Sequence, residues 1–168
     1  LKHQSESSPK ILDTVSEFEH DAQRLTKVAD RFSKIGSKPD LKEENITDLI
    51  RRTVRYFEKR IPQMGKKVDI TIQARDGFTA MVNSELFEWV IENLIKNALD
   101  AMEDGKGSIS VSLLKEGNRT IIDVKDTGKG IAPEHLATIF DKFVQVKNSM
   151  SATPGSVGLG LAIAKEIV

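Results

Sequence analysis

The longest stretch of helical hydrophobic spacing runs from Ser84 to Met102. Apolar residues recur there every three or four positions, which predicts one long helix with Ser84 at or near its N-cap and a broad face packed on a sheet. This face consists of Leu86, Val90, Ile91, Leu94, Ile95, Ala98 and Leu99. Because the apolar face is so broad, we expect this helix to organise the core.

A second helical pattern lies between Ile11 and about Ile35. Its apolar residues fall on two heptad positions, with Ile11, Phe18, Leu25 and Phe32 on one and Val15, Ala22 and Ala29 on the other. So narrow a seam is typical of a coiled coil or helical bundle and requires a partner helix. Packing of the stripe against the chain's own domain is the alternative. The breaker-rich residues 36–40 predict a linker, which divides the chain into residues 1–38 and 39–168.

Alternation of β-branched and polar residues predicts strands in the middle of the chain, at residues 68–72, 78–82, 108–114 and 120–124. We expect the first two to form a hairpin through Asp76-Gly77 and the last two to be joined at Gly117-Asn118. Helical spacing predicts a helix over residues 46–57 that ends before Pro62, and short helices near residues 133–139 and 159–168.

Composition narrows the classes of protein. The 25 Lys and Arg residues balance 25 Asp and Glu residues, so no global attraction to nucleic acid follows. The absence of cysteine excludes disulfides, thiolate metal sites and cysteine nucleophiles. No apolar run approaches the ~20 residues of a membrane-spanning helix. The chain begins at Leu1 rather than Met, so we expect a fragment, and a membrane segment in its parent stays open.

Two amides, Asn93 and Asn97, lie four residues apart on the long helix and therefore share one side of it. Neutral amides in line on a core-forming helix suggest a polar ligand at the edge of that helix. The alternative is a pair of solvated residues.

Asp126 ends a predicted strand and is followed by Gly128 and Gly130. A carboxylate at this place can accept a hydrogen bond from an exocyclic amine, and the glycines allow a flat ring to approach the backbone. The alternative is a turn in which the aspartate only satisfies backbone amides.

Gly155, Gly158 and Gly160 precede an apolar helix over residues 161–168. Glycines at a helix start expose backbone amides, and together with the helix dipole they favour an anion such as phosphate. The pattern is neither a P-loop nor a Rossmann fingerprint, in which Ile163 would be glycine or alanine. A plain flexible loop is the alternative.

Residues 139–147 place Phe140 and Phe143 beside Lys142 and Lys147. We expect the aromatic rings to anchor a lid and a lysine to reach the phosphate groups of a ligand. The alternative is that the phenylalanines are ordinary core residues.

Four segments in this order resemble the N, G1, F and G2 boxes of the ATP-binding domain of sensor histidine kinases. They are the Asn93–Asn97 helix, residues 126–130, residues 139–143 and residues 155–161, and the resemblance covers roughly residues 41–168. It implies the Bergerat fold shared with DNA gyrase, the Hsp90 chaperones and MutL, an α/β sandwich with a mixed sheet and helices on one face. The family's domain usually continues with two more strands after the G2 box, and we expect this chain to lack them.

The resemblance also implies roles for single residues. Asp126 would accept from the adenine amino group, and Asn97 would hold Mg²⁺ while Leu159 and its neighbouring glycines contact ATP. Asn93 stands where rapidly hydrolysing relatives carry a glutamate that activates water, and an amide cannot act as a base. Val157 stands where the family often has Thr or Ser, which removes one hydroxyl contact.

The phosphoacceptor histidine is not recognisable in this chain. The family's motif has an acidic residue after the histidine and a proline five residues on, whereas Gln4 follows His3 and Pro9 is six residues away. His20 has no such neighbours either. Residues 11–35 resemble the second helix of the family's dimerisation and phosphoacceptor hairpin, so the first helix is expected to be missing.

The resemblance therefore implies the catalytic part of a two-component sensor kinase that uses Mg-ATP and is not self-phosphorylating as a fragment. The parent would form a homodimer through the N-terminal helical segment and serve a response regulator receiver domain, with no nucleic acid partner. Two alternatives stay open: a nucleotide-gated interaction module, and an ATPase of the gyrase, chaperone or mismatch-repair type, which Asn93 disfavours.

Overall fold

The structure is a computed structural model that describes residues 26, 29, 33, 39–74, 77–141 and 160–167, without the side chain of Ile163. The chain falls into two compact units, Leu1–Pro39 and Asp40–Val168. Thr26, Ala29 and Ser33 are helical and exposed, and the rest of the helix predicted between Ile11 and Ile35 lies outside the described residues. No helix in the described part of the chain has the length and hydropathy to cross a membrane.

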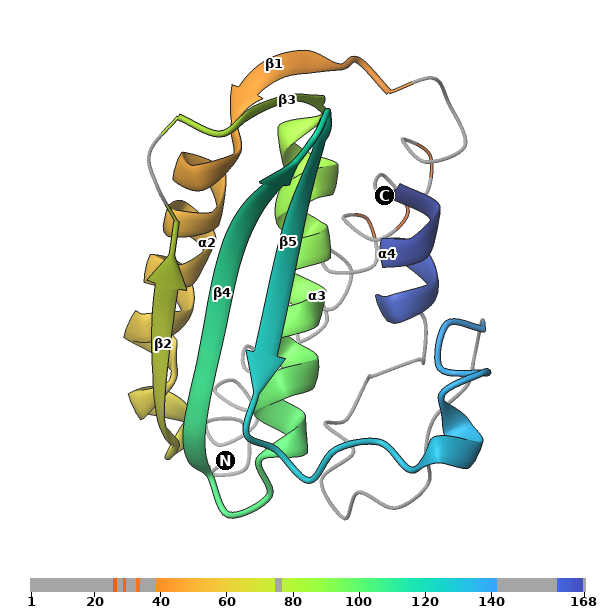
Figure 1. Cartoon of the computed structure of the whole chain (residues 1–168). Coiled ribbons are helices and arrows are strands. Elements are labelled where there is room, and N and C mark those ends of the chain that lie inside the picture. The colour runs from red at the N-terminus through yellow and green to blue at the C-terminus, as the bar shows by residue number, and fades with distance from the viewer. Residues whose placement is uncertain are drawn as a thin grey trace, which may run out of the picture. The chain divides into compact units, whose positions relative to one another are not determined.

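A three-stranded mixed sheet forms the second unit's flat layer (Figure 1). Its order is β2 (Lys67–Gln73), β4 (Lys106–Glu116) and β5 (Arg119–Asp126). β2 and β4 are parallel, with Ile70 beside Ile109, and β4 and β5 form an antiparallel hairpin. Gly117 turns this hairpin with φ +59°, which confirms the loop predicted at Gly117-Asn118.

A separate two-stranded sheet joins β1 (Lys42–Asn45) to β3 (Thr79–Val82). The predicted hairpin between residues 68–72 and 78–82 is therefore wrong: β3 is a strand, but it pairs antiparallel with β1, from Lys42 opposite Val82 to Asn45 opposite Thr79. The partner escapes sequence analysis because its segment, KEEN, has no apolar alternation. The backbone NH of Ile46 extends this pairing by donating to the carbonyl of Phe78 at 2.8 Å.

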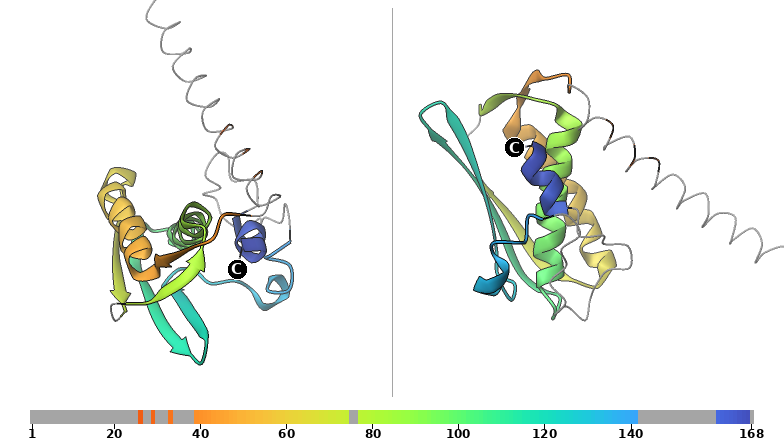
Figure 2. Two further views of the ribbon diagram at one scale, coloured as in Figure 1. Left: turned by 90° about the horizontal axis from the view of Figure 1, so that it is seen from above. Right: turned by 90° about the vertical axis from the view of Figure 1, so that its right-hand side faces the viewer.

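Two helices, α2 (Ile46–Arg60) and α3 (Ser84–Ala101), cover one face of the three-stranded sheet (Figures 1 and 2). The core lies between these layers and includes Ile50, Ile95, Ile109 and Val111, all with no exposed surface, together with Ile91 and Leu99. Burial of one such side chain contributes roughly 1.5–3 kcal/mol. The mixed sheet with helices on one face confirms the predicted α/β sandwich.

The ends of α3 are fixed by side chains. The cap at its start is Asn83 rather than Ser84, because the Asn83 side-chain oxygen accepts from the backbone NH of Leu86 at 3.1 Å. At the other end the Lys66 ammonium donates to the carbonyls of Leu99 and Met102. A cation at a helix C-terminus satisfies free carbonyls and complements the helix dipole.

The remaining helical elements are short. The helix predicted near residues 133–139 is a 3-10 turn, η2 (Pro133–His135), followed by further turns, and η1 (Pro62–Met64) is of the same kind. α4 (Gly160–Ile167) matches the helix predicted near residues 159–168. It lies against α3 on the side away from α2 (Figure 2), with Ala162 and Ala164 buried.

Candidate nucleotide site

One stripe of α3 connects the described segments that the sequence analysis assigned to nucleotide binding. Asn93, Asn97 and Ala101 follow each other at four-residue intervals, so they share a side of the helix and span about 12 Å along its axis. Gly160, the first residue of α4, lies against Asn93, and the turn after β5 lies against Ala101. Asn97 is exposed between these two contacts.

Asn93 contacts the start of α4. A Cβ atom added to Gly160 would lie 3.2 Å from the Asn93 side-chain oxygen. The Asn93 side-chain nitrogen is buried and has no hydrogen-bond partner among the described residues. An unsatisfied buried donor costs roughly 1–3 kcal/mol, so this nitrogen is suited to an acceptor supplied by a ligand beside the helix start.

Asp126 ends β5 with its side chain exposed. One carboxylate oxygen, Oδ1, accepts from the backbone NH of Gly128 at 2.8 Å. The alternative role considered above, satisfaction of a backbone amide, is thus present for this oxygen. It also fixes the direction of the carboxylate and leaves Oδ2 free to accept from an exocyclic amine.

Gly128 is required by packing. A Cβ atom there would lie 2.5 Å from the Cβ of Ala101 and 2.8 Å from Oδ1 of Asp126. The next residue, Lys129, donates its backbone NH to the carbonyl of Ala101 at 3.1 Å. The described contacts give Gly128 a role in seating the turn on α3, whereas Gly130 has φ +74° and open space around it.

Sequence reasoning missed the residues that hold this turn in place. Thr127 exchanges two hydrogen bonds with Ser108 of β4, one through its backbone NH at 3.2 Å and one accepted by its hydroxyl at 3.0 Å. The Lys129 ammonium pairs with Glu103 at 2.6 Å. A Thr between Asp126 and Gly128 carries no signal of this pairing without the register of β4 and β5.

The other predicted site residues lie outside the described residues: Lys142, Lys147, Gly155, Gly158 and Leu159. Within the described residues no group of three or more His, Cys, Asp or Glu side chains is arranged to hold a metal. A metal here would depend on Asn97 and on oxygens supplied by the nucleotide, which fits Mg²⁺, since Mg²⁺ takes few protein ligands.

Comparison with known proteins decides the family. The family described as histidine kinase-, DNA gyrase B-, and HSP90-like ATPase matches residues 82–168, just over half of the chain. The chain belongs to this family. Within it, the matching curated relatives are sensor kinases, so the chain carries the ATP-binding catalytic domain of a sensor histidine kinase.

Two curated relatives illustrate the similarity. The chain is 33% identical over 154 residues to the sensor protein VanS of Enterococcus faecium, covering 88% of this chain and 39% of VanS. It is 30% identical over 144 residues to the sensor protein KdpD of Clostridium acetobutylicum, covering 86% of this chain and 15% of KdpD. The chain thus spans well under half the length of these relatives.

Solved structures agree on the fold of this sensor histidine kinase domain. The catalytic domain of the histidine kinase ThkA superposes with a TM-score of 0.64 at 23% identity, over 77% of this chain and 80% of that one. Full-length ShkA, solved in complex with AMPPNP, gives 0.74 at 22% identity, over 99% of this chain and 34% of ShkA.

Proposed function

We propose that Asn93, Asn97 and the Asp126–Gly130 turn together bind Mg-ATP. We also propose that the whole protein passes the γ-phosphoryl group to a histidine outside the catalytic domain. The observation that carries this proposal is the unsatisfied buried nitrogen of Asn93 beside the first residue of α4. Such a donor, next to the positive end of a helix, is suited to a phosphate oxygen.

Each described residue has a task in this proposal. Asp126 accepts from the adenine amino group through Oδ2, because Oδ1 is held by Gly128. Asn97, one helical turn from Asn93, offers its amide oxygen to Mg²⁺, which when bound neutralises charge on the phosphates. Asn93 donates to a phosphate oxygen. Lys142, Lys147, Gly155, Gly158 and Leu159 are proposed to complete the phosphate side and the lid.

The proposed reaction is transfer of the γ-phosphoryl group of ATP to a histidine, without hydrolysis by water. The bond from the γ-phosphorus to its bridging oxygen breaks, a bond to an imidazole nitrogen forms, and ADP leaves. Catalysis of this kind depends on positioning and charge neutralisation. Asn93 cannot accept a proton from water, so the γ-phosphoryl group is retained for the histidine.

The remaining parts of the proposal concern the whole protein. ThkA has been solved in complex with the response regulator protein TrrA. We infer that the protein containing this chain likewise serves a receiver domain, that it is a homodimer through residues 1–38, and that the domain works in the cytoplasm. Because neither His3 nor His20 has the neighbours of a phosphoacceptor, we infer that the acceptor lies outside this sequence.

Nucleotide selectivity tests the proposal. We expect titration calorimetry with Mg²⁺ to show binding of ATP and at least tenfold weaker binding of GTP, which has a carbonyl where adenine has its amino group. Asp126→Asn should weaken ATP binding by about 1–3 kcal/mol, because a charged acceptor is replaced by a neutral one. Glu103→Gln is the control, since Glu103 pairs with Lys129 of the same turn. Equal affinity for ATP and GTP would refute the role given to Asp126.

A further inference from the structure

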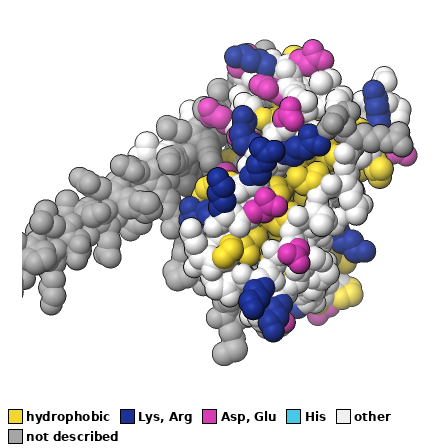
Figure 3. Space-filling model, turned by 90° about the vertical axis from the view of Figure 1, so that its left-hand side faces the viewer, with side chains coloured by type: hydrophobic (Ala, Val, Ile, Leu, Met, Phe, Trp, Pro, Cys, Tyr) yellow, Lys and Arg dark blue, Asp and Glu magenta, His cyan; other side chains and the backbone are white. Residues whose placement is uncertain are grey.

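The exposed side of α2 carries a row of cations that the nucleotide site does not use. Arg51, Arg55 and Lys59 recur at four-residue intervals, about 6 Å apart along the helix axis. α3 lies between this helix and α4 (Figures 1 and 2), so the row is on the other side of α3 from the contact between Asn93 and Gly160. Figure 3 shows Lys and Arg side chains gathered on this face of the molecule.

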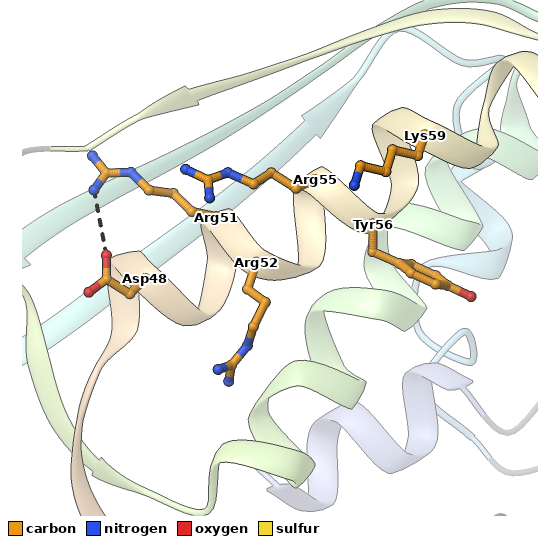
Figure 4. Close-up of a pocket in the computed structure, with 6 residues that line it drawn as sticks. All are labelled: Asp48, Arg51, Arg52, Arg55, Tyr56 and Lys59. Atoms are coloured by element: carbon orange, nitrogen blue, oxygen red, sulfur yellow. Dashed lines mark ion pairs between the residues drawn. The ribbon is translucent and has the colours of Figure 1, made fainter.

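The row borders a groove of about 570 Å³ lined by Asp48, Arg51, Arg52, Arg55, Tyr56 and Lys59. Figure 4 shows Arg51, Arg55 and Lys59 in line on one side of α2, with Arg52 and Tyr56 projecting on the other. We call these five residues with Asp48 the α2 groove.

Part of the charge in the α2 groove is already paired. Arg51 contacts Asp48 at 3.6 Å, and Arg52 contacts Glu88 of α3 at 2.6 Å. Arg55 and Lys59 are exposed and make no ion pair or hydrogen bond with any described residue. The groove therefore offers two adjacent cations, one guanidinium and one ammonium, to an external anion.

Tyr56 gives the groove a fixed aromatic centre. The side chain is half exposed, at 49%, and its ring packs edge-on against Phe57 at 5.4 Å between centroids. The Arg60 guanidinium lies 5.1 Å from the same ring centroid, within the range of a cation–π contact. Tyrosine and arginine are enriched at the energetic centres of protein interfaces.

We propose that the α2 groove docks an acidic α-helix of a protein partner, with Asp or Glu side chains repeated at four-residue intervals. Such carboxylates recur about every 6 Å, the same spacing as the two available cations, Arg55 and Lys59. Arg55 can hold a carboxylate through two parallel hydrogen bonds, and Lys59 supplies a second charge one turn on. Tyr56 packs against the aliphatic side-chain carbons of the partner helix.

Charge and shape favour a protein helix over a flat polyanion. Asp48 is part of the groove with 65% of its side chain exposed, and it lies about 10 Å from Arg55 along the helix axis. Two carboxylates one helical turn apart can therefore meet Arg55 and Lys59 without facing Asp48, whereas a lipid surface or duplex laid across the whole groove would also meet this carboxylate. Tyr56 is the one aromatic side chain in the groove lining, where an interfacial helix would present several apolar ones. The chain as a whole has equal numbers of acidic and basic residues and exerts no long-range attraction on nucleic acid.

The test uses designed probes and the full chain. An alanine-based helical peptide with glutamate at every fourth position is titrated by fluorescence anisotropy at low ionic strength. A second peptide of the same composition has its glutamates distributed around the helix. Vesicles of phosphatidylcholine with phosphatidylserine form the third probe. The variant is Arg55→Glu/Lys59→Glu. The control is Lys106→Glu/Lys115→Glu, which changes the net charge equally at two exposed lysines of β4.

We expect the clustered peptide to bind at least about tenfold more tightly than the distributed one, and the α2 variant to lose about tenfold in that affinity, because two attractions become repulsions. The β4 control should change it less than twofold, and ATP affinity should be unchanged in both variants. Equal binding of the two peptides, no detectable binding, or an unaffected α2 variant would refute the proposal. Vesicle binding that depends on Arg55 and Lys59 without a peptide preference would also refute it, in favour of a membrane surface.

Discussion

At the scale of single residues, Asn93 is expected to lower the stability of the nucleotide-free protein and to donate a hydrogen bond to bound ATP. Its buried side-chain nitrogen has no partner among the described residues, so replacement by a leucine of similar size should raise the unfolding free energy or leave it unchanged. The same replacement should weaken ATP binding, because the donor to the phosphate is lost. Thermal unfolding without nucleotide and calorimetry with ATP measure the two effects.

Asn97→Leu is the matched comparison for Asn93→Leu. Asn97 is exposed, so its replacement should bring no gain in stability while making ATP affinity insensitive to Mg²⁺. A marked loss of stability in Asn93→Leu, with ATP affinity intact, would contradict the role proposed for Asn93.

Gly128 is a residue whose reason for being glycine is visible only in three dimensions. We expect Gly128→Ala to destabilise the domain by about 1–3 kcal/mol, because the added methyl would lie 2.5 Å from the Cβ of Ala101. Ala101→Gly in the same chain should recover part of this loss. Asp126 Oδ1 at 2.8 Å and the Ala101 carbonyl carbon at 2.9 Å keep the recovery incomplete. Additive effects in this double-mutant cycle would argue against the contact.

The D-x-G-x-G pattern predicted a ligand-binding turn but not this contact. The sequence shows which residue types occur together, and a family resemblance attaches roles to them. The distance from Gly128 to Ala101 depends on how far β5 runs before the turn and where α3 ends, and neither is encoded at positions 126–130.

At the scale of elements, the start of α3 distinguishes two neighbouring candidates for its cap. Asn83→Ala should cost about 1 kcal/mol of stability, because the Asn83 side chain accepts from the NH of Leu86 and donates to the carbonyl of Asp40 at 3.2 Å. Ser84→Ala, at the position predicted from the sequence, should change stability by less than about 0.5 kcal/mol. Chemical denaturation of both variants measures the difference. A larger effect at Ser84 would show that the cap is misplaced.

The same scale shows what local patterns predict and what they miss. α2, α3, β2, β4 and β5 follow from periodicity because each has an apolar side facing the core. β1 does not, since Lys42, Glu43 and Glu44 are exposed or half-buried and the strand is defined by its pairing with β3. Pairing between residues far apart in sequence depends on how the helix between them packs, so the hairpin predicted from the short Asp76-Gly77 connection was wrong.

At the scale of the whole molecule, the function proposed above places nucleotide binding and the phosphoacceptor histidine in different segments of the protein. The three-stranded sheet, α2 and α3 share one packed core. Asn93 and Asn97 lie on the side of α3 that faces α4, and the Asp126–Gly130 turn contacts the end of the same helix at Ala101. The histidine that would receive the phosphoryl group belongs, in the function proposed above, to another segment. A chain of this kind should bind ATP and do little with it alone.

Steady-state phosphate release tests whether the chain hydrolyses ATP by itself. General-base catalysis contributes about 10²–10⁴-fold where a base lies within hydrogen-bond reach of the attacking water. Asn93 is an amide, and the neighbouring positions on its stripe of α3 are Trp89 and Asn97, which cannot serve either. We therefore expect negligible phosphate release with saturating Mg-ATP, and no transfer of labelled phosphate to His3 or His20. Brisk release that Asn97→Ala abolishes, and that removal of residues 1–38 does not change, would identify a self-sufficient ATPase and refute the kinase function proposed here.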